Sequence, residues 1–125
     1  MKNASDNKML RIRKLVELVF GDKPENHLDL RYQLLTACGG VLLEAKERKI
    51  KNAVLLVLVF LKAGTDADGN TYYTEDNRQR NHHDWQSFLK QTNAKITPQG
   101  YFKVPTQGEC SKINLYVQKL EIPIP

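Results

Sequence analysis

The N-terminal part of the chain is patterned as an amphipathic helix. From Lys8 to Phe20 the apolar residues recur at intervals of three and four, which places them on one helical face. Asp6 or Asn7 can serve as N-cap, and Gly21 stands where a left-handed residue ends a helix. Residues 1–8 are polar and are expected to be frayed. The pattern therefore predicts one amphipathic helix that follows a short frayed N-terminus.

A second helix is predicted from Asp29 to Arg48, where apolar side chains again form a continuous stripe. Its interior contains Gly39 and Gly40, and each glycine costs about 1 kcal/mol relative to alanine inside a helix. Such a cost indicates either a kink or the close approach of another backbone. Because Thr36 and Ala37 are also small, we favour close packing of this flat strip on a sheet.

The segment from Ala53 to Leu61 is wholly apolar and shows no alternation of polar and apolar residues. A strand that is apolar on both sides is typical of a position with both faces buried. The sequence therefore predicts a central strand with helices on either side of it.

The next predicted helix runs from Thr74 to about Thr92, and Asn81 offers a second N-cap at which it could be broken. Its buried face is expected to contain Trp85, Phe88 and Leu89. The buried face is thus predicted to lie in the second half of this helix.

Two strands are predicted in the C-terminal part, from Tyr101 to Val104 and from Ile113 to Ile122. Apolar and polar residues alternate in the second of them, as in a half-buried edge strand. Proline cannot sit inside a central ladder, so the sheet is expected to end at Pro123.

These elements predict a single α/β domain over residues 9–125, since a chain of 125 residues is too short for two full domains. The expected architecture is a small two-layer or three-layer sandwich. Its short mixed sheet would contain a buried central strand at about 53–61, flanked by helices.

Composition limits the location of the protein. The chain is 41% hydrophobic and 26% charged, and no apolar run approaches the roughly 20 residues of a membrane span, so a soluble protein without membrane contact is expected. The N-terminus lacks the features of a secretory signal, which indicates a cytoplasmic location. Cys38 and Cys110 match neither a disulfide framework nor a zinc pattern, and we interpret both as reduced thiols.

The formal net charge of +5 permits binding to nucleic acid. Lys46, Arg48, Lys49 and Lys51 crowd the end of the second predicted helix. The helix dipole favours cations there and accounts for most of this clustering. Contact with nucleic-acid phosphates is the alternative.

Two polar strings resemble metal sites but have the wrong spacing. The run from Asp66 to Asn70 lacks the glycine and glutamate positions of an EF-hand, and Asp68-Gly69 is better explained as a turn. His82 and His83 are adjacent on a predicted helix, where neighbouring side chains point about 100° apart and cannot chelate one ion together. Neither string predicts a metal centre.

Glu44-Ala45-Lys46 spells the E-x-K triplet of metal-dependent nucleases. That triplet requires a strand, on which residues two apart share one face. Here it lies on a predicted helix, where Glu44 and Lys46 diverge by about 200° and cannot meet at one metal ion. We interpret it as a coincidence on a solvated helix face.

Several strings, in the same order along the chain, resemble an uncharacterised bacterial family with a restriction-endonuclease-like, PD-(D/E)XK-type fold. They are Arg31 to Leu35 (RYQLL), Leu43 to Ala45, Asn52 to Phe60, Asn81 to Leu89 and Asn114 to Tyr116. The resemblance covers about residues 10–120 and corresponds to the C-terminal half of the family. It implies that the metal-binding aspartate and E-x-K strands would precede the equivalent of Met9, where this chain has only polar residues.

The resemblance also implies a position for Gln33. A glutamine on the helix that follows the catalytic strands can face the metal centre of such folds, with Arg31 and Tyr32 as its neighbours. A simple helix-surface amide is the alternative reading of Gln33.

The expected function is therefore a binding or interaction domain without hydrolytic activity of its own, with neither catalytic residue nor cofactor. The alternative is a Mg²⁺-dependent nuclease that completes its site from another subunit or an upstream segment. Weak catalytic candidates are Gln33, Glu44 and Lys46, with Asp66 or Asp68 as further ligands. The expected partners are nucleic acid, a second copy or the upstream segment. Nucleic acid would meet Arg31, Lys46, Arg48, Lys49 and Lys51.

Overall fold

The computed structural model describes residues 4–21, 30–62, 64–72 and 74–124. In chain order the elements are α1 (Ala4–Phe20), α2 (Leu30–Glu47), β1 (Asn52–Lys62), α3 (Glu75–Gln91), β2 (Lys95–Ile96), β3 (Phe102–Val104), the 3-10 helix η1 (Gly108–Cys110) and β4 (Asn114–Ile124). The predicted α/β fold class is confirmed. None of the described helices is long and apolar enough to cross a membrane.

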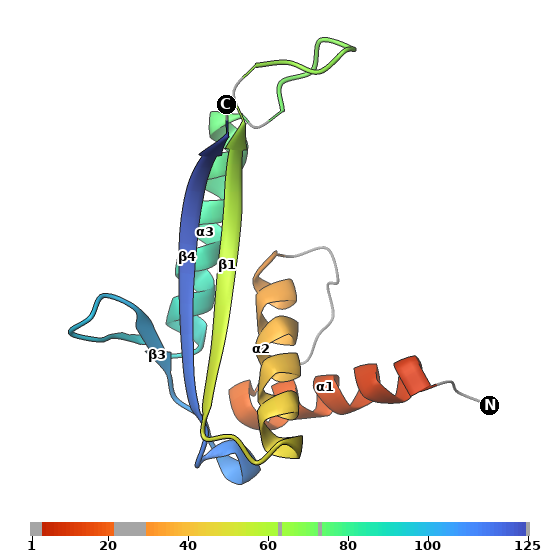
Figure 1. The fold of residues 1–125 in the computed structure, drawn as a ribbon, viewed down its shortest axis with the longest axis vertical. Helices are drawn as coiled ribbons and strands as arrows, with labels where there is room; N and C mark the ends of the chain where they lie inside the picture. Colours follow the sequence, from red (N-terminus) through yellow and green to blue (C-terminus); the bar gives the residue numbers. More distant parts are fainter. Residues whose placement is uncertain (1–3, 22–29, 63, 73, 125) are drawn as a thin grey trace.

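The strands form a four-stranded mixed sheet in the order β1-β4-β3-β2. β1 and β4 run parallel along their whole length, from the pair Asn52 and Asn114 to the pair Lys62 and Ile124. β3 is antiparallel to both β4 and β2. Figure 1 shows the two long strands side by side at the centre of the molecule. β1 is therefore an edge strand, and the predicted central position of residues 53–61 is wrong.

The described helices cover only one face of this sheet. Figure 1 shows α3 behind β1 and β4, with α2 and α1 to one side. Leu35 of α2 and Phe88 of α3 are fully buried in one core with Leu115 and Val117 of β4. Along β1 the odd-numbered residues face this core, whereas the even-numbered residues are exposed. The domain is a two-layer sandwich, and the prediction that β1 has helices on both sides is wrong because the described helices supply cover for one side.

The first helix differs from its prediction mainly at its start. α1 begins at Ala4, so much of the segment expected to be frayed is helical. Asp6 and Asn7 therefore lie inside the helix, and neither is its N-cap. The predicted end is confirmed, because Gly21 adopts a left-handed conformation with φ of 70°.

The other two helices agree well with the sequence. α2 begins at Leu30, next to the predicted start at Asp29, which lies outside the described residues. α3 runs without a break through Asn81, and the hydroxyl of its N-cap Thr74 accepts a hydrogen bond from the amide of Asn77 at 3.0 Å. The predicted buried face of α3 is confirmed for Trp85, Phe88 and Leu89.

β4 occupies an interior position in the sheet, so its predicted place at the edge is wrong. The predicted alternation is confirmed, since the odd-numbered residues from Ile113 to Val117 are buried. Pro123 lies within the strand and pairs with Leu61, one residue before β4 ends. A proline is tolerated there because β3 pairs only with the first part of β4, which leaves the other side of the strand open at that height.

The glycine pair of α2 packs against a helix rather than against the sheet. A Cβ atom on Gly39 would lie 2.8 Å from Cγ2 of Val16 and 3.2 Å from the backbone oxygen of Ile12, both in α1. A Cβ atom on Gly40 would meet only Cδ1 of Ile12, at 3.7 Å. The predicted close approach exists, but its partner is α1, and Gly39 alone requires it.

These contacts predict opposite effects for two alanine substitutions in α2. Gly39→Ala should lower the free energy of unfolding by about 1 to 3 kcal/mol, because the new methyl group overlaps α1. Gly40→Ala should raise it by up to about 1 kcal/mol, because alanine favours a helix and the site has room. Urea unfolding followed by circular dichroism measures both variants. A Gly39→Ala protein as stable as the parent would contradict the proposed helix contact.

Candidate functional site

The E-x-K triplet lies on α2, and its two charged side chains belong to separate ion pairs. Oε1 of Glu44 accepts a hydrogen bond from Nε of Arg48 at 2.6 Å, one helical turn away. Lys46 forms its ion pair with Glu109 of η1. The hydrogen bond from Arg48 and the charge of this guanidinium lower the pKa of Glu44 below its ordinary value. The divergence that helical geometry predicts for the triplet is therefore present.

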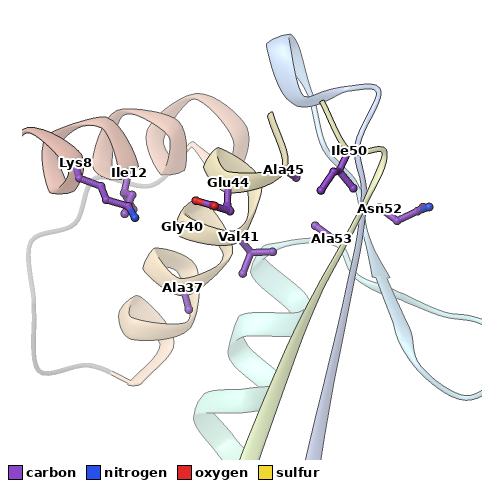
Figure 2. Close-up of a pocket in the computed structure, with 10 residues that line it drawn as sticks. All are labelled: Lys8, Ile12, Ala37, Gly40, Val41, Glu44, Ala45, Ile50, Asn52 and Ala53. Carbon is purple, nitrogen blue, oxygen red and sulfur yellow. The ribbon is translucent and has the colours of Figure 1, made fainter. Parts of the chain in front are cut away.

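A shallow depression of about 540 Å³ lies beside Glu44, between α1, α2 and the start of β1. Figure 2 shows the carboxylate of Glu44 and the amine of Lys8 at one side of it, and Ile50, Asn52 and Ala53 at the other. Most of the lining is aliphatic, and Glu44 supplies the only carboxylate among the lining residues. Nowhere in the described ranges do three or more His, Cys, Asp or Glu side chains gather as metal ligands. The depression has no metal-binding chemistry.

Gln33 and Arg31 lie at the N-terminal end of α2. Gln33 is exposed, whereas Tyr32 beside it is buried in the fold. The guanidinium of Arg31 donates a hydrogen bond to the side-chain oxygen of Gln91 in α3. A rise of 1.5 Å per residue puts Arg31 about 22 Å from Lys46 along the helix. The structure does not bring Gln33 together with Glu44 and Lys46.

The structure divides the predicted basic residues between the two ends of α2. Arg31 belongs to the other end of α2, and Lys46 and Arg48 are held in ion pairs. Lys49 and Lys51 remain exposed in the turn after α2, with a left-handed backbone at Lys49, where φ is 57°. Contact of this turn with nucleic acid stays a prediction.

The loop from Asp66 to Asn70 is the turn that the sequence predicts. Oδ1 of Asp66 accepts hydrogen bonds from the amides of Asp68 and Asn70, each at 2.9 Å, and Gly69 has a φ of 84°. The carboxylate of Asp66 is thus used to close its own turn. His82 and His83 are exposed on the first half of α3, as expected for a solvated helix surface.

Both cysteines are free thiols, as predicted, and both are buried. Burial raises the pKa of the Cys38 thiol to about 12. Burial and the neighbouring Glu109 also raise the pKa of Cys110, although Lys46 opposes this effect. A nucleophilic cysteine needs a thiolate and access to solvent, and neither side chain meets that requirement.

The most unusual surface is the side of the sheet that the described helices leave uncovered. Six large apolar residues of β1 and β4 remain between 39% and 63% exposed, namely Val54, Leu56, Leu58, Phe60, Leu120 and Ile124. The register places them together, with Leu58 beside Leu120 and Phe60 beside Ile122. We call this side of the sheet, formed by the even-numbered residues of β1 and β4 with Lys95 and Lys103, the open face.

Hydrogen bonds and one aromatic contact border the open face on the β3 side and at one end. The amide of Gln118 donates to the backbone oxygen of Gly100 at 3.2 Å, and Tyr101 makes an edge-to-face contact with Tyr116. The β2–β3 turn therefore borders β4 along one side. At the start of the ladder, Asn114 donates a side-chain hydrogen bond to Asn52.

Sequence reasoning missed the open face, although the signal was present. The apolar run of β1 predicts a strand covered on both sides, because it shows no alternation of polar and apolar residues. The strand is apolar as predicted, but only one of its faces is covered by the described helices. Sequence alone reports how apolar a strand is, but not which chain covers it.

Over residues 1–124 the sequence matches a family model described as a domain of unknown function (DUF6946). No curated protein matches the chain, and no solved structure does.

The burial of the two thiols predicts their reactivity. Both thiols are buried, and the raised pKa also keeps Cys38 protonated at mildly alkaline pH. Both cysteines of the folded protein should therefore resist Ellman's reagent. Both should react fully in concentrated guanidinium chloride. Rapid labelling of either thiol in the folded protein would contradict its burial.

Proposed function

We propose that the chain, which belongs to the DUF6946 family, is an interaction domain that docks another protein on its open face. The single observation that carries this proposal is the row of exposed apolar side chains along β1 and its continuation on β4. Exposed apolar surfaces of this extent mark interaction sites in soluble proteins. Burial of these half-exposed side chains would stabilise a complex by about 1 kcal/mol each.

The strand pairing supports the same proposal. The longest strand pair of this mixed sheet, β1 with β4, is parallel, and all-parallel sheets occur almost only where both faces are covered. One face has its cover in α2 and α3, and the open face has none among the described residues. A docked partner would supply the second layer.

A nuclease is the alternative function, and the described residues offer it little. Glu44 and Lys46 form ion pairs with different partners, and the carboxylate of Asp66 closes a turn. Restriction-endonuclease-like ancestry remains a proposal that the strings of the sequence support. An active site would have to be completed from another subunit or segment.

The proposed lack of catalysis has a direct test. Purified protein incubated with supercoiled plasmid and Mg²⁺ or Mn²⁺ should leave the DNA intact, because the carboxylates of the described residues do not converge. Reproducible cleavage that disappears in Glu44→Gln would show a nuclease instead. Glu47→Gln is the matched control, since Glu47 is an exposed neighbour in a different ion pair, with Arg11.

The proposed docking surface can be tested by site-specific photocrosslinking in the cells from which the chain comes. A photoreactive residue at Leu58 should give a covalent product of one discrete higher mass. The same residue at Leu18, an exposed leucine of α1 on the other side of the molecule's core, should not. Equal products from both positions, or none from Leu58, would refute docking on the open face.

A further inference from the structure

We infer that the partner on the open face is an amphipathic α-helix with acidic side chains, contributed by another protein. This inference rests on the proposed function and specifies the chemistry of the docked segment. Three features of the open face support it: its dimensions, the sign of its charges and a basic depression at one end.

The dimensions of the apolar stripe suit a helix. β1 and β4 pair over their whole length, and 11 residues at about 3.3 Å each give a stripe about 36 Å long. Two neighbouring strands are about 10 Å wide, which is close to the diameter of a helix. A helix of about 24 residues would cover the stripe from end to end. Over the parallel pair it would complete the helix–sheet–helix layering that all-parallel sheets have.

The charges of the open face have a single sign. Its charged residues are Lys62, Lys95 and Lys103, and none of the described residues on this face is acidic. The chain as a whole contains 14 acidic residues, so their absence here is a property of this face. Glu121 of β4 points to the opposite side, where it pairs with Arg78 of α3. A partner with carboxylates beside its apolar stripe would complement these lysines.

Two of the lysines form a basic depression. Lys95 of β2 and Lys103 of β3 are direct partners across the antiparallel pair, where like charges repel each other. No described carboxylate forms an ion pair with either lysine. They line a depression of about 340 Å³ together with Ser111, which follows η1, and Asn114, the first residue of β4. An acidic side chain of the partner would bind here and relieve the repulsion.

A second copy of the chain fits this surface less well. Face-to-face packing of two copies would bring lysines together without a carboxylate from either open face. At the far end of the open face the charged residue is again a lysine, Lys62, whose Nζ lies 4.4 Å from the centroid of the Tyr72 ring. Neither end of the face therefore offers a carboxylate to a second copy. The charge pattern therefore favours a different protein over self-association.

The test uses the full chain and two labelled synthetic helical peptides of about 24 residues. Both carry the same leucine stripe, but glutamate flanks it in one peptide and lysine in the other. Fluorescence anisotropy should show that the glutamate peptide binds about tenfold or more tightly than the lysine peptide, with the preference falling as salt rises.

Variants of the protein locate the binding. The double variant Leu56→Ser and Leu58→Ser should lose both peptides while keeping the circular dichroism spectrum of the parent, since both side chains are exposed. The variant Lys95→Glu and Lys103→Glu should reverse the preference toward the lysine peptide. Lys14→Glu, an exposed charge change on α1, should alter neither affinity. If Lys14→Glu had the same effect as the pair, net charge alone would be responsible and the inference would fail.

Other outcomes assign the face to a different occupant and overturn the inference. Light scattering that shows a dimer, separated by the two serine substitutions, would assign it to a second copy. Binding to vesicles of anionic phospholipid without binding to either peptide would assign it to a membrane surface. In the dimer case the open face remains a docking surface, because the crosslink at Leu58 would then join two chains, and only the identity of the docked chain changes. If no crosslink forms at Leu58, the proposed function itself fails.

Discussion

The parallel pairing of β1 with β4 is the constraint on which the rest of the structure depends. Its first pair, Asn52 and Asn114, joins residues that are 62 positions apart. Two parallel strands cannot be joined by a tight turn, so the intervening chain has to cross over the sheet. α3 forms that crossover and covers one face, while β2 and β3 return to extend the sheet beyond β4.

Close packing between α1 and α2 keeps the helices together in a single layer. Gly39 allows α1 to approach the backbone of α2, so the small residues of α2 serve a helix–helix contact. The apolar residues on other sides of α2, such as Leu35 and Leu42, point into the core shared with the sheet. Both helices therefore lie on the same side as α3, and none of the three is left for the opposite face.

Much of this fold could be predicted from the sequence, because periodicity and capping signals report local structure well. The bounds of α2 and α3, the burial of Trp85 and Phe88, and the left-handed end at Gly21 all follow from local patterns. The strand order could not be predicted, since it depends on pairings between distant residues. The candidate surface was missed for the same reason: an apolar strand gives the same pattern whether its cover comes from its own chain or from another.

The separation of β1 and β4 also affects how the protein is made. At about 5 to 20 residues per second, a ribosome needs several seconds to synthesise the chain that separates the two strands. Throughout that interval β1 has no strand beside it, because β4 is its one neighbour in the described sheet. The most apolar strand of the fold is therefore synthesised first among the strands and is paired only when the last of them emerges. During synthesis the open face and both edges of β1 are accessible together, which makes this interval the period of greatest risk for aggregation.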